Sequence, residues 1–65
     1  MHFVFYRTSD VFAAEEYLQN NGIDIEIVPT PVQDKAYCGI CLKVERSSID
    51  TANHLLAFME YQIVE

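Results

Sequence analysis

The spacing of apolar residues switches between two periods along the chain, and this alternation limits the folds that the chain can adopt. Residues 2–6 are apolar and aromatic, which predicts a first β-strand. Val11, Ala14 and Leu18 then recur at helical spacing, after a helix start at residues 8–10 that offers a hydroxyl cap and an acid. Gly22 ends this helix, because glycine accepts the left-handed conformation common at helix C-termini.

The second half of the chain repeats this change of period. Residues 23–27 alternate isoleucine with carboxylates, which predicts a half-buried strand that ends near two prolines. Residues 39–45 predict another strand, with Ile40, Leu42 and Val44 on one face. A second helix opens at residues 47–50, and residues 61–64 form a last short strand. The apolar stripe of that helix consists of Ala52, Leu55, Leu56 and Met59.

The order β-α-β-β-α-β predicts an α+β protein of ferredoxin-like architecture, a two-layer sandwich. Its two helices cover one face of a four-stranded antiparallel sheet. With 65 residues the chain has room for a single domain, residues 1–65. Because strand side chains alternate, Phe3 and Phe5 cannot share a face with Val4 and Tyr6. One pair must point away from the helices, and this aromatic surface makes a homodimer a reasonable expectation.

The charge balance excludes several classes of partner. Ten carboxylates and four basic residues give a net charge of −6, so the chain lacks the basic face that nucleic acids require. An anionic membrane surface is disfavoured for the same reason, and no apolar run approaches the roughly 18 residues of a membrane span. In the absence of a signal-peptide pattern, we expect a cytoplasmic protein with reduced thiols. With only two glycines the chain has no phosphate-binding loop, and we expect no cofactor.

The segment between the second and third strands, residues 29–37, is longer than the about two to five residues of an ordinary hairpin. Two prolines stiffen its start, and the residue between them should be extended. Long loops in small domains are often functional. The candidate substrate-loop residues are therefore Pro29, Thr30, Pro31, Lys35 and Gly39.

Cys38 and Cys41 are the most distinctive chemical groups of the chain. If residues 38–41 are extended, their Cα atoms lie roughly 10 Å apart, and a disulfide needs about 7 Å or less. If Gly39 makes a turn, the thiols can meet. A dithiol oxidoreductase is one interpretation, although no helix follows to activate the first thiol. Zinc is another, but a closed site needs four ligands and the chain adds only His2 and His54, so we predict no metal. A third interpretation is that both cysteines are packing residues.

Several short motifs together resemble the selenium/sulfur carrier-like proteins, a family of small bacterial domains, over nearly the whole chain. They are the first strand with Thr8-Ser9-Asp10, then Ala14-Glu15, Gly22-Ile23, Val28-Pro29-Thr30-Pro31 and Cys38-Gly39. The resemblance implies that Cys38 holds sulfur or selenium as a persulfide or selenenylsulfide. The chain departs from the family at Val32, where an arginine is usual, and at Lys35-Ala36-Tyr37, where small or hydroxyl residues are usual. Lys35 is a candidate substitute for the arginine.

These observations favour a carrier or binding protein over a stand-alone enzyme. We hypothesise that the Cys38 thiolate accepts and donates sulfur or selenium, and that Cys41 is its resolving thiol. The partners would then be sulfur or selenium donor and acceptor proteins. The alternative is a small dimeric interaction or regulatory module in which both cysteines are structurally inert.

Overall fold

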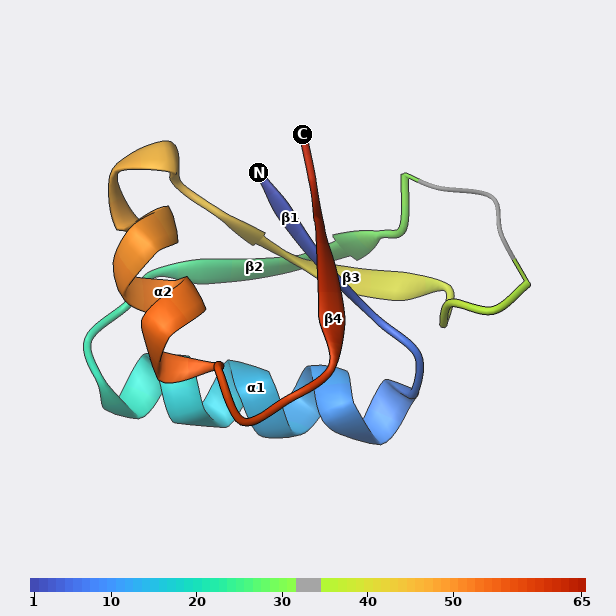
Figure 1. The fold of residues 1–65 in the computed structure, drawn as a ribbon, viewed down its shortest axis with the longest axis horizontal. Helices are drawn as coiled ribbons and strands as arrows, with labels where there is room; N and C mark the ends of the chain where they lie inside the picture. The colour runs from blue at the N-terminus through green and yellow to red at the C-terminus, as the bar shows by residue number, and fades with distance from the viewer. Residues whose placement is uncertain (32–34) are drawn as a thin grey trace.

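The computed structural model describes residues 1–31 and 35–65, and it confirms the predicted α+β sandwich (Figure 1). The two helices and four strands follow one another in the predicted order. In chain order the elements are β1 (His2–Phe5), α1 (Thr8–Asn20), β2 (Ile25–Pro29), β3 (Ile40–Val44), a 3₁₀ helix η1 (Arg46–Ser48), α2 (Ile49–Leu55) and β4 (Tyr61–Val64).

The four strands form one sheet in the order β2-β3-β1-β4, and each neighbouring pair is antiparallel. β1 lies inside the sheet, where Phe3 is opposite Leu42 of β3 and Ile63 of β4. This order is that of a ferredoxin-like sheet, in which the first and third strands are central. β2 and β4 are therefore the outer strands, and the two chain ends lie close together (Figure 1).

The hydrophobic core lies between the helices and one face of the sheet. Phe3 and Phe5 are fully buried there, and their ring centroids lie 4.9 Å and 5.7 Å from that of Tyr61. The other buried members come from α1, β3 and the α2 region: Val11, Ala14, Leu18, Leu42, Val44, Ala52 and Leu56. Strand alternation consequently directs Val4 and Tyr6 to the opposite face, where Val4 is buried and Tyr6 is 40% exposed.

The end of α1 is stabilised as its glycine predicts. Gly22 has a φ of 78°, and its N–H donates to the Gln19 carbonyl, while the Ile23 N–H donates to the Leu18 carbonyl. This pair of bonds satisfies carbonyls that a helix end leaves unpaired. The predicted hydroxyl cap at the start of α1 is wrong, because Arg7 is the capping residue and no side chain bonds there.

The boundaries of the other elements differ slightly from the predicted ones. β2 begins at Ile25 instead of Ile23, because the Ile23 N–H is engaged by the end of α1. β3 is shorter than predicted at both ends, and η1 precedes α2. Among the described residues, no helix has the length and apolar character needed to span a bilayer.

The conformation of Gly22 makes its replacement costly. We expect Gly22→Ala to lower the free energy of unfolding by about 1–2 kcal/mol, since a Cβ disfavours the left-handed region. Gly39→Ala is the matched control, because Gly39 has no positive φ and a Cβ there would meet no atom within 4 Å. Urea denaturation of both variants measures the difference, and equal losses of stability would contradict the assignment.

Candidate functional site

The backbone of Cys38 is hydrogen-bonded to the last residue of β1 and to the residue that follows β2. Its N–H donates to the carbonyl of Phe5, the last residue of β1, at 3.0 Å. Its carbonyl accepts a hydrogen bond from the Thr30 hydroxyl at 2.7 Å, and the Thr30 N–H donates to the Gly39 carbonyl at 3.0 Å. Cys38 is thus held in place although it lies before β3 begins.

The bond between Cys38 and Phe5 departs from the register of the sheet. Because Val4 is opposite Cys41, the ladder would place Phe5 opposite Ile40, yet the Phe5 carbonyl accepts from Cys38. The chain therefore bends at Gly39. This bend needs no glycine, because Gly39 has no positive φ and the space at its missing Cβ is open. An alanine could therefore occupy this position without contacting another part of the chain.

The Cys38 side chain is half-buried and packs against the edge of the hydrophobic core. Its Sγ donates a hydrogen bond to the Ile40 carbonyl at 2.9 Å. A thiolate has no proton to share with a carbonyl oxygen, so ionised Cys38 would have to turn away from Ile40. Cys38 is thus a partly exposed residue at the boundary between loop and sheet, with its thiol hydrogen-bonded to the backbone.

Cys41 lies in a different environment from Cys38. It is fully buried beside its cross-strand neighbours Val4 and Val28, on the sheet face away from the helices. Its Sγ lies 3.8 Å from the Pro29 carbonyl oxygen. Burial raises the pKa of the Cys41 thiol above its ordinary value of 9.0, against a smaller lowering by a hydrogen bond with Thr30. Both cysteines are free thiols, so they form no disulfide in this structure.

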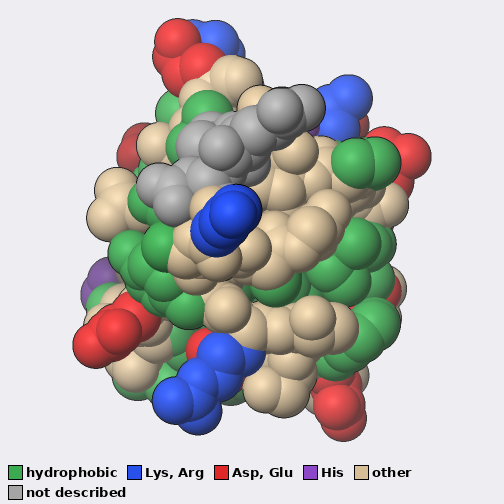
Figure 2. Space-filling view, turned by 90° about the vertical axis from the view of Figure 1, so that its right-hand side faces the viewer, with side chains coloured by type: hydrophobic (Ala, Val, Ile, Leu, Met, Phe, Trp, Pro, Cys, Tyr) green, Lys and Arg blue, Asp and Glu red, His purple; other side chains and the backbone are tan. Residues whose placement is uncertain are grey.

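The other predicted loop residues are arranged around this bend. Pro29, Pro31 and Lys35 are exposed, whereas Thr30 is half-buried and bonds Cys38. Residues 32–34, which include the position where the family usually has an arginine, lie outside the described residues. Figure 2 shows this end of the molecule, where hydrophobic side chains reach the surface and Lys and Arg side chains lie among them.

Sequence reasoning missed one contact at this site, a stacked pair of tyrosines. The rings of Tyr6 and Tyr37 lie 5.1 Å apart and nearly parallel, with an interplanar angle of 28°. Tyr37 immediately precedes Cys38, and Tyr6 follows the strand that holds Cys38. The stack therefore joins the loop to the end of β1. The available signal was an aromatic residue directly before the cysteine and another directly after the first strand.

The described residues offer no ready metal site. No group of three or more His, Cys, Asp or Glu side chains in this part of the chain is placed to hold an ion. The two histidines also lie in different parts of the fold. His2 precedes the inward-facing Phe3 on β1, so its side chain points to the sheet face away from the helices, whereas His54 is exposed on α2.

Comparison with protein families gives one match, to the family described as "Putative Se/S carrier protein-like", over residues 2–64. The chain belongs to this family. The match extends across every helix and strand of the fold, and it includes the loop and both cysteines of this Se/S carrier-like protein. No curated protein and no solved structure matches the chain.

The difference in burial predicts different reactivities for the two thiols. We expect Ellman's reagent to modify Cys38 at least about tenfold faster than Cys41, because a buried thiol reacts only after local opening. The Cys41→Ala variant reports the rate of Cys38, and Cys38→Ala reports that of Cys41. Equal rates in the two folded variants would contradict the observed burial.

The raised pKa of Cys41 predicts a loss of stability at alkaline pH. Below about pH 8.5 the thiol is protonated in both the folded and the unfolded chain. Above it the unfolded chain loses this proton first, so the free energy of unfolding should fall as the pH rises toward the folded-state pKa. Urea titrations across this range should show a shallower fall for Cys41→Ala. An unchanged slope would contradict the effect of burial.

Proposed function

We propose that this protein carries sulfur or selenium on Cys38 between a donor and an acceptor protein. Membership of the Se/S carrier-like family supports carriage in general. The single observation that supports Cys38 as the carrier atom is its position, half-buried and hydrogen-bonded at the boundary between a loop and the sheet. Cys41 is fully buried and shielded from a protein donor.

The geometry around Cys38 suits a carrier thiol, which must be fixed in position and still be approached by a donor protein. Backbone bonds to Phe5 and Thr30 fix the residue, which limits the entropy lost when a donor docks. Gly39, the next residue, is exposed and adds no side chain that would cover the Cys38 segment. Exposed Lys35 could attract an anionic donor group to this end of the molecule.

The proposed transfer is an exchange without net oxidation. The Cys38 thiolate attacks the terminal sulfur of a donor persulfide, R–S–SH, and forms a new sulfur–sulfur bond. The donor's own S–S bond breaks, and the donor leaves as the thiolate R–S⁻. A donor of the form R–S–SeH would transfer selenium by the same exchange. An acceptor thiolate then removes the terminal atom and restores the Cys38 thiolate.

Cys41 would take part only after a local opening of the sheet. If it acts as a resolving thiol, it attacks the Cys38 sulfur, forms a Cys38–Cys41 disulfide and expels hydrosulfide. This step requires the buried thiol to ionise, which its raised pKa opposes. Transfer to an external thiol needs no such opening, so we assign Cys41 to release only as a secondary role.

Loading of Cys38 can be measured by mass spectrometry of the intact protein. After incubation with a cysteine desulfurase and cysteine, we expect the wild-type chain to gain one sulfur atom. The added mass should disappear on treatment with a reducing thiol, which removes a persulfide sulfur. Peptide mapping should place it on Cys38.

Two matched variants separate the thiols. Cys41→Ala should load as the wild type does, whereas Cys38→Ser should not load, and circular dichroism checks that both are folded. Loading of Cys38→Ser to the wild-type level would disprove the assignment. A wild-type chain that gains no sulfur or selenium from desulfurase or selenide donors would favour a dimeric interaction module with inert cysteines.

A further inference from the structure

β4 is an outer strand whose free edge faces solvent. It pairs with β1 on one side and with none of the other described strands on its outer side. The N–H and C=O groups that an outer strand directs away from its partner can pair with another chain. Among the described residues, no backbone hydrogen bond of a turn or loop involves residues 60–65. This edge therefore offers backbone donors and acceptors.

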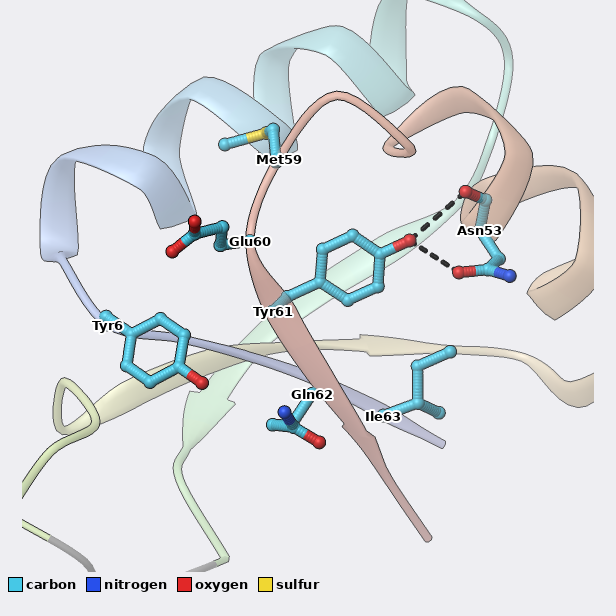
Figure 3. Close-up of a pocket in the computed structure, with 7 residues that line it drawn as sticks. All are labelled: Tyr6, Asn53, Met59, Glu60, Tyr61, Gln62 and Ile63. Atoms are coloured by element: carbon cyan, nitrogen blue, oxygen red, sulfur yellow. Dashed lines mark hydrogen bonds between the residues drawn. The ribbon is translucent and has the colours of Figure 1, made fainter.

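A hollow follows this edge on the molecular surface (Figure 3). Tyr61 and Gln62 of β4 line it, together with Ile63, which is 39% exposed. The Tyr61 hydroxyl donates to the Asn53 carbonyl at 3.1 Å, which holds β4 against the α2 region. The hollow thus lies on fixed elements, with an apolar side chain exposed beside the strand edge.

The opposite edge of the sheet is protected from such pairing. β2 ends in Pro29, which has no backbone N–H, and it carries exposed Glu26 after exposed Asp24. Proline and charged residues are common ways in which proteins block an outer strand. β4 contains neither proline nor charge between Tyr61 and Val64. The two edges therefore differ, and β4 is the one suited to a partner.

The charges around β4 indicate what kind of segment would fit. Glu60 lines the hollow, whose described lining has no Lys or Arg, and Glu65 follows the strand with its carboxylate 3.6 Å from the guanidinium of exposed Arg46. Pairing of β4 with a second copy in the register that sets Glu60 of one chain opposite Glu65 of the other would bring like charges together, which is unfavourable. A segment with basic residues would instead meet opposite charge.

We propose that the β4 edge binds an extended segment of a partner protein, with alternating apolar and basic residues, as an added strand. Extended peptides bind sheet edges in this way through main-chain hydrogen bonds. Contacts through the end of β1 would connect such a partner to the segment that holds Cys38. Tyr6 lines the hollow and stacks on Tyr37, the neighbour of Cys38, while Phe5 pairs with Tyr61 and bonds Cys38. As a docking site for a donor or acceptor, the edge rests on the proposed carrier function.

Binding can be tested with a blocked peptide, acetyl-Lys-Val-Lys-Val-Lys-Val-amide, titrated into ¹⁵N-labelled protein. We expect amide shift changes concentrated at residues 60–65 and slower hydrogen exchange of the β4 amides. A peptide with N-methylated backbone amides cannot donate hydrogen bonds and should bind about tenfold more weakly. The analogue with glutamate in place of lysine should bind more weakly still.

Matched variants test the position of the site. Glu60→Gln should weaken binding about threefold, whereas Glu26→Gln, which removes the same charge from an exposed position on β2, should leave it unchanged. Shift changes centred on β2, or equal binding of the N-methylated peptide, would overturn the proposal. Concentration-dependent protection of β4 without peptide would assign the edge to a second copy and also overturn it.

One further variant separates this proposal from the carrier function. Cys38→Ser should bind the peptide as the wild type does, although it should carry no sulfur. Loss of peptide binding in a folded Cys38→Ser variant would show that the thiol environment, rather than the strand edge, holds the peptide, and would count against the edge site. If the wild-type chain binds the peptide but takes up no sulfur, the docking surface is supported and the proposed carrier function is contradicted.

Discussion

Phe5 connects the hydrophobic core of the fold to the segment that contains Cys38. Its ring is fully buried in the core, and its carbonyl accepts the N–H of Cys38. Because β1 lies inside the sheet, this carbonyl is fixed by the pairing of β1 with both neighbours. Cys38 is therefore positioned by a residue of the core, although Cys38 itself belongs to a loop.

The same sheet geometry gives the two cysteines different properties. Cys38 precedes the bend at Gly39 and is half-buried, whereas Cys41 lies within β3 between two valines of neighbouring strands. One residue more or less between them would turn the second side chain toward the other face. The two cysteines of this short motif thus lie in different environments: Cys38 is partly exposed, and Cys41 is buried as a packing residue.

The thiol and the proposed docking edge meet at one end of the molecule. Tyr6 takes part in both, because it lines the hollow along β4 and stacks on the residue before Cys38. A carrier must hold its cargo and be recognised by its partners, and a chain of 65 residues has little surface for separate sites.

Local patterns in the sequence determined the elements of the fold and their order. The alternation of residues 23–27, the stripe of α1 and the glycine after it each express a backbone preference that acts over a few residues. The motifs around Cys38 also indicated the family. Tertiary structure alone decided which face of β1 enters the core, that Cys41 is buried, and that the Phe5 carbonyl holds Cys38. These depend on contacts between residues far apart in the chain, which no local pattern encodes.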